Sequence, residues 1–171
     1  MYGGKKQNQR GFTLIELLIV IAIIAILAGV AFVALDPLTR FRDARDSRRW
    51  SDITSILNAI KIDQVDNGGN YMSAITNMAS GSVYMIVNGA VSSGCDDQNA
   101  NCDTDVSGDS YCVNLAGLVT DGYLGSIPVG PNGAGSWTSS LSGYTLQRDS
   151  NGIITVRSCE SENSEEIWVA R

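Results

Sequence analysis

The chain of 171 residues contains no histidine. This absence removes the commonest general base and the commonest nitrogen ligand of metal ions. No nucleophile, base and orienting residue can be assembled from what is left, and the carboxylates lie in loop-type sequence without a motif that gathers them. We therefore expect a protein that is not an enzyme.

Positive charge is scarce in the larger part of the chain. After residue 50 there are 4 basic and 14 acidic residues, a net charge of −10. Such a surface repels phosphate groups, so we do not expect nucleic acid as a partner. The remaining cations gather near the N-terminus (Lys5, Lys6 and Arg10) and in a cluster of five arginines, which comprises Arg40, Arg42, Arg45, Arg48 and Arg49.

The chain contains only four cysteines, which is an even number. Cys95, Cys102, Cys112 and Cys159 lie in a region rich in Gly, Ser and Asn, which favours two disulfides and an oxidising compartment. Zinc is disfavoured because there is no C-x-x-C pair. Two arrangements stay open: a Cys102–Cys112 bond, or Cys95–Cys102 with Cys112–Cys159. We slightly prefer the second, in which the last bond ties the middle of the domain to its final strands.

The sequence also contains one long apolar run. It extends over 24 residues, from Phe12 to Leu35, and contains a single carboxylate, Glu16. As a helix it spans about 36 Å, enough to cross a bilayer core of about 30 Å. It is too long for a secretory signal and lacks an A-x-A-like cleavage site. We therefore predict a transmembrane helix, although a carboxylate in hydrocarbon is costly unless paired or protonated.

The helical pattern continues beyond this run. Apolar residues follow at steps of three and four, which predicts an amphipathic helix whose inner face carries Trp50, Ile53, Ile56, Leu57 and Ile60. The sequence DNGGN at 66–70 is a stop signal, so one helix should run from about 13 to 66. Pro37 predicts a kink or local loosening within 33–37.

The rest of the chain is predicted to form strands and loops. Four segments have strand composition: 82–87, 144–149, 153–158 and 165–171. The sequence DSNG, 149–152, predicts a hairpin turn, and 113–128 should begin as a short helix. The expected fold is α+β, with an antiparallel sheet of three or four strands packed on the second half of the long helix.

One acidic loop has the spacing of a calcium ligand set. In DTDVSGD the oxygen-bearing residues alternate before a glycine, which gives the candidates Asp103, Asp105, Ser107 and Asp109. The bidentate glutamate of such a loop is missing, because Asn114 occupies the twelfth position. A solvated surface loop without any cofactor is therefore the favoured interpretation, and calcium is the alternative.

The sequence GFTLIELLIVIAIIAILA, which begins at Gly11, resembles the N-terminal signature of type IV pilins and of the pseudopilins of type II secretion. The resemblance implies that a prepilin peptidase cuts between Gly11 and Phe12 and that the new amine of Phe12 is methylated. Glu16 then matches the glutamate at the fifth mature position. In a filament it would pair with the Phe12 amine of a neighbour, which sets the register.

The resemblance also implies the organisation of the chain as a type IV pilin fold. It divides into a cleaved leader (1–11), a transmembrane and filament-core helix (12–36), an amphipathic continuation (37–67) and a globular domain (68–171). Two positions depart from the family. Val33 stands where many pilins have a proline, and Gly130 stands where major pseudopilins often have an acid, so their calcium site is not carried over.

The expected function is a structural subunit that polymerises as a homo-oligomer into a pilus-like filament for adhesion, motility or uptake. The precursor would lie in the inner membrane with the assembly machinery, and the product would be an extracellular pilus. One alternative is a pseudopilin of a type II secretion system, in a periplasmic pseudopilus. An alternative of another class is a membrane-anchored binding domain that never polymerises.

The arginine cluster has two interpretations in this setting. The favoured one is a solvated helix face neutralised by i,i+4 pairs, namely Asp36–Arg40, Arg42–Asp46 and Arg48–Asp52. In the other, the arginines contact lipid headgroups before assembly and acidic surfaces of neighbouring subunits afterwards.

Overall fold

The computed structural model describes residues 11–163 and 165–171. Apart from Gly11, the predicted leader lies outside the described residues. The chain divides into two compact units, Met1–Arg40 and Phe41–Arg171.

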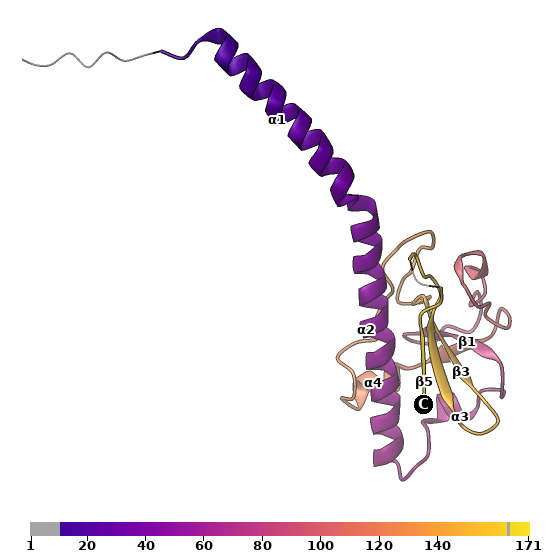
Figure 1. Ribbon diagram of the computed structural model, residues 1–171. Coiled ribbons are helices and arrows are strands. Elements are labelled where there is room, and N and C mark those ends of the chain that lie inside the picture. The colour runs from indigo at the N-terminus through magenta and orange to yellow at the C-terminus, as the bar shows by residue number, and fades with distance from the viewer. Residues whose placement is uncertain (1–10, 164) are drawn as a thin grey trace, which may run out of the picture. The chain divides into compact units, whose positions relative to one another are not determined.

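The first unit contains α1, Leu14–Leu35 (Figure 1). The apolar run forms a helix because Leu, Ile and Ala dominate it, and every residue of α1 is exposed. Its length and composition suffice to cross a membrane. Asp36 ends it in the left-handed region (φ 34°), and α2 begins at Pro37. The predicted loosening is confirmed, because proline disfavours helical geometry in the residue before it.

The second unit contains most of α2, Pro37–Asp66. The predicted inner face is confirmed at four positions: Ile53, Ile56, Leu57 and Ile60 are buried. Trp50 is the exception, with 41% of its surface exposed. The helix ends at Asp66 as predicted, since Gly68 and Gly69 adopt positive φ angles (66° and 95°) that few other residues tolerate.

Among the described residues, the sheet has five strands in the order β2-β1-β3-β4-β5, of which Figure 1 labels β1, β3 and β5. Their bounds are Val83–Val87 (β1), Cys112–Asn114 (β2), Tyr144–Arg148 (β3), Ile154–Ser158 (β4) and Trp168–Ala170 (β5). The four predicted strands and the 149–152 hairpin are confirmed. The expected number of three or four strands is wrong, because β2 adds a fifth. This strand pairs in parallel with β1, whereas all other pairs are antiparallel.

In the part of the chain that the structure describes, three short helical segments complete the elements: α3 (Ser73–Thr76), η1 (Asn99–Asn101) and α4 (Ala116–Thr120). The short helix expected within 113–128 corresponds to α4, but it begins only after β2.

Both faces of β1 are buried, and they belong to different cores. Ile86 packs with the inner face of α2 and with Leu146 and Val156 in the larger core. Met85 and Val87 point to the other face and pack in a second core with Cys95, Val106, Trp137 and Cys159. The disulfide-rich loops therefore cover the face of the sheet that α2 does not.

Candidate functional site

The predicted cleavage and assembly residues lie at the start of α1. Thr13 is the N-cap, and its hydroxyl accepts a hydrogen bond from the Glu16 N–H (3.3 Å). The Glu16 carboxylate in turn accepts from the Thr13 N–H (3.3 Å) and hydroxyl (3.2 Å). This reciprocal arrangement is a capping box, which satisfies two helix N–H groups that lack carbonyl partners.

The bond between Gly11 and Phe12 lies before this cap, in a segment without helix or strand structure. Phe12 is 82% exposed. A peptidase that cuts this bond would therefore meet no folded element. The new amine would appear next to Thr13 and four residues from Glu16, at the end of the helix where the macrodipole is positive.

The arginine cluster differs from the prediction. The side chain of Arg49 is only 1% exposed, and it forms ion pairs with three carboxylates: Asp46 (2.8 Å), Glu160 (2.7 Å) and Glu162 (2.8 Å). The favoured interpretation as a solvated face is therefore wrong for Arg49. The predicted Arg48–Asp52 pair is present at 3.7 Å. Sequence reasoning missed the network because Glu160 follows Arg49 by 111 residues.

Arg45 contributes a second guanidinium to the same network. Its Nε donates to Glu162 Oε1 (2.6 Å), and its Nη2 also pairs with Glu162. The hydrogen bonds from Arg45, together with the one from Arg49, lower the pKa of Glu162 from 4.5 to about 2. Glu162 is therefore a carboxylate held in its ionised form by two arginines of α2.

The network joins α2 to two loops. Arg49 Nη2 donates to the carbonyl of Pro131 (3.1 Å), and the Gly135 N–H donates to Glu160. A Cβ at position 133 would overlap a carboxylate oxygen of Glu160, so a larger residue there would displace the side chain that pairs with Arg49. A buried charge with several hydrogen bonds thus fixes the loop 131–135 and the segment that follows Cys159 on the helix.

The disulfides are Cys95–Cys112 and Cys102–Cys159. Two bonds were predicted, and both proposed pairings were wrong. The backbone explains the true partners: the Cys95 N–H donates to the Asp109 carbonyl (3.0 Å), just before Cys112, and the Asp103 N–H donates to the Cys159 carbonyl (2.6 Å). These contacts depend on how the loop folds back, which cysteine spacing does not reveal.

The predicted calcium ligands form hydrogen bonds with different parts of the chain. Asp103 accepts from the Ser161 hydroxyl (2.6 Å), Ser107 accepts from the Val83 N–H (2.9 Å), and Asp109 accepts from the Gly94 N–H (2.6 Å). The structure brings Asp109 together with Asp96 and Asp97. Asp103 and Asp105 lie outside that group, so calcium binding by the predicted set stays a prediction.

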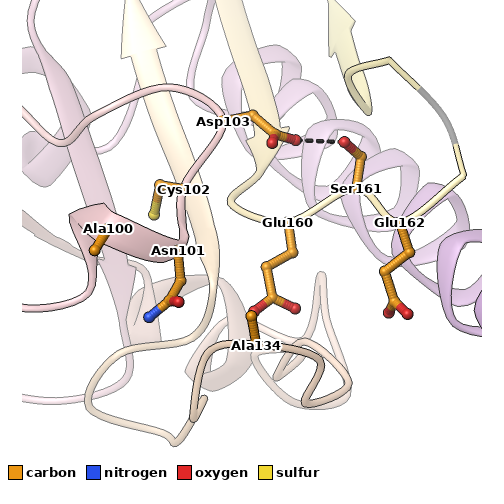
Figure 2. Close-up of a pocket in the computed structure, with 8 residues that line it drawn as sticks. All are labelled: Ala100, Asn101, Cys102, Asp103, Ala134, Glu160, Ser161 and Glu162. Atoms are coloured by element: carbon orange, nitrogen blue, oxygen red, sulfur yellow. Dashed lines mark hydrogen bonds between the residues drawn. The ribbon is translucent and has the colours of Figure 1, made fainter.

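Asp103 also lines a polar pocket with Glu160, Ser161 and Glu162 (Figure 2). In this view Glu160 and Glu162 extend from the segment that follows Cys159, while Asp103 points toward Ser161 from the loop that contains Cys102. Both glutamates accept hydrogen bonds from Arg49. These carboxylates therefore already have cationic partners and serve to fix the loops.

Comparison with known proteins identifies a known motif in the N-terminal segment. Residues 6–32 match the prokaryotic N-terminal methylation motif, which is the class III prepilin signature of type IV pilins and pseudopilins. No curated protein and no solved structure shows significant similarity to the chain. The motif implies processing by a prepilin peptidase, and together with the apolar helix it fits a membrane-anchored precursor. The motif thus supports a pilin- or pseudopilin-like subunit.

Proposed function

We propose that the chain is the precursor of a pilus subunit. A prepilin peptidase cuts it between Gly11 and Phe12, the Phe12 amine is methylated, and the mature chain polymerises into a helical filament whose core is built from copies of α1. The filament emerges from the inner membrane to the cell surface, where its loops are displayed.

The observation that supports this proposal most directly is the position of Glu16. It is the single carboxylate of α1, a helix that is apolar and exposed along its whole length. Such a helix needs a membrane or other apolar helices around it. Cleavage creates a cation within a few residues of Glu16, so a neighbouring subunit offers a partner of opposite charge at the required depth.

The proposal is tested by N-terminal mass spectrometry and by two substitutions. The mature chain should begin with methylated Phe12. Glu16→Gln retains the capping box, because an amide also accepts from the Thr13 N–H, but it removes the negative charge. We expect this variant to reach the membrane at wild-type levels and to form at most a tenth of the wild-type filament.

Thr13→Ala is the matched control, since it removes the cap and keeps the carboxylate; it should assemble. Wild-type filament from Glu16→Gln would contradict the pairing, and an uncut N-terminus would contradict the whole proposal. Electron microscopy of sheared cell surfaces then distinguishes long extracellular pili from a short periplasmic pseudopilus.

A further inference from the structure

The five arginines around the start of α2 contribute unequally to its surface. Arg49 is buried, and Arg45 has its charge offset by Glu162. Arg42 is exposed and forms no ion pair with any residue that the structure describes. The side chain of Arg48 is 63% exposed, and its pair with Asp52 is long at 3.7 Å. Of the cluster's four arginines in the second unit, Arg42 and Arg48 therefore provide the accessible positive charge.

A groove opens beside Arg42. Its lining consists of Arg42, Arg45, Asn132, Gly133, Ala134 and Glu162. The single carboxylate in this lining is held by two arginines, so it does not cancel the charge of Arg42. The groove thus presents a cation, an amide side chain and the edge of a glycine loop, a surface that favours carboxylates.

A second surface of the same unit has the opposite charge. The loop 95–112 contains five aspartates and no basic residue. Four of them, Asp97, Asp103, Asp105 and Asp109, are exposed, and among the described residues none of the five forms an ion pair. Both disulfides hold this loop in place, so little conformational entropy is lost when a partner binds its aspartates.

We propose that the groove at Arg42 of one copy binds the acidic loop 95–112 of a second copy. The inference rests on the proposed function, which brings many copies together. Every copy carries both surfaces, so each groove has a loop available. Each copy can therefore contact one neighbour through its groove and another through its loop, and such a heterologous contact extends into an open filament when its rotation does not close. Opposite charges also guide the encounter and disfavour other registers.

The test is a zero-length cross-link in the full-length chain. Arg42→Lys keeps the charge and supplies an amine that a carbodiimide couples to a carboxylate in contact with it. Copies labelled with ¹⁴N and ¹⁵N are mixed in neutral lipid vesicles, cross-linked and digested. We expect mixed-isotope peptides that join residue 42 to the 96–109 segment. Their yield should fall at least tenfold between about 0.1 and 1 M salt, as the screening length drops from about 10 to 3 Å.

Arg171→Lys is the matched control, an exposed cation that lines a different groove with Ile62 and Val65. It should give no such peptide. Mixed-isotope peptides at equal yield from both variants, links confined to one isotope, or loss of the link when the vesicles contain anionic lipid would each overturn the inference. Adding Glu16→Gln to the Arg42→Lys chain should leave the cross-link at residue 42 intact, so a failed filament and a failed groove contact are distinguishable.

Discussion

At the scale of single residues, Arg49 determines how the loops are held on α2. Replacing it with methionine leaves Asp46 and Glu160, which are both buried, without their cation. Breaking a buried ion network in this way costs about 3–5 kcal/mol. We expect Arg49→Met to lower the free energy of unfolding by that amount, measured by urea denaturation in detergent. Arg48→Met, the exposed control, should cost less than about 1 kcal/mol, and an equal loss in both would contradict the assignment.

Glu162 makes the free energy of unfolding depend on pH in the acidic range. Its pKa is about 2 in the folded chain and near 4.5 when unperturbed. A lowered pKa stabilises the fold above pH 4.5, and this contribution disappears as the pH falls through 2. We expect roughly 2 kcal/mol to be lost in that window. Glu162→Gln should show a flatter pH profile there. Parallel profiles for the two chains would contradict the ion pairs with Arg45 and Arg49.

At the scale of elements, the two disulfides should contribute unequally. Cys95–Cys112 spans 17 residues and Cys102–Cys159 spans 57. In the chain-entropy description these loops correspond to about 3 and about 4 kcal/mol. Paired serine substitutions should therefore destabilise the fold more at 102 and 159 than at 95 and 112, as measured by urea denaturation. The reverse order would show that local packing outweighs loop length.

The elements that sequence predicted are those with local signals. The helical spacing up to Asp66 and the DSNG turn each depend on a few adjacent residues, and both are confirmed. The strand β2 was missed because it has three residues and its parallel partner, β1, lies more than twenty residues earlier. The burial of Arg49 and the cysteine pairing were missed for the same reason, since their partners are distant in sequence and meet only when the loops close.

At the scale of the whole molecule, membrane retention should depend on the middle of α1. Ile24 lies near its centre. An arginine there costs about 3 kcal/mol on insertion scales, so Ile24→Arg should reduce the fraction of precursor that resists carbonate extraction. Ile24→Leu, the control, should be extracted like the wild type. Unchanged retention of the arginine variant would contradict a spanning role for α1.

The two disulfides also interleave along the chain, because Cys102 lies inside the loop that Cys95 and Cys112 close, and Cys159 lies outside it. Together the bonds bracket every peptide bond from 95 to 159. A protease that cuts once anywhere in this region therefore leaves two fragments that stay covalently joined, and between 102 and 112 they are joined twice. The exposed loops between residues 95 and 159 can therefore each be nicked once without the release of either fragment.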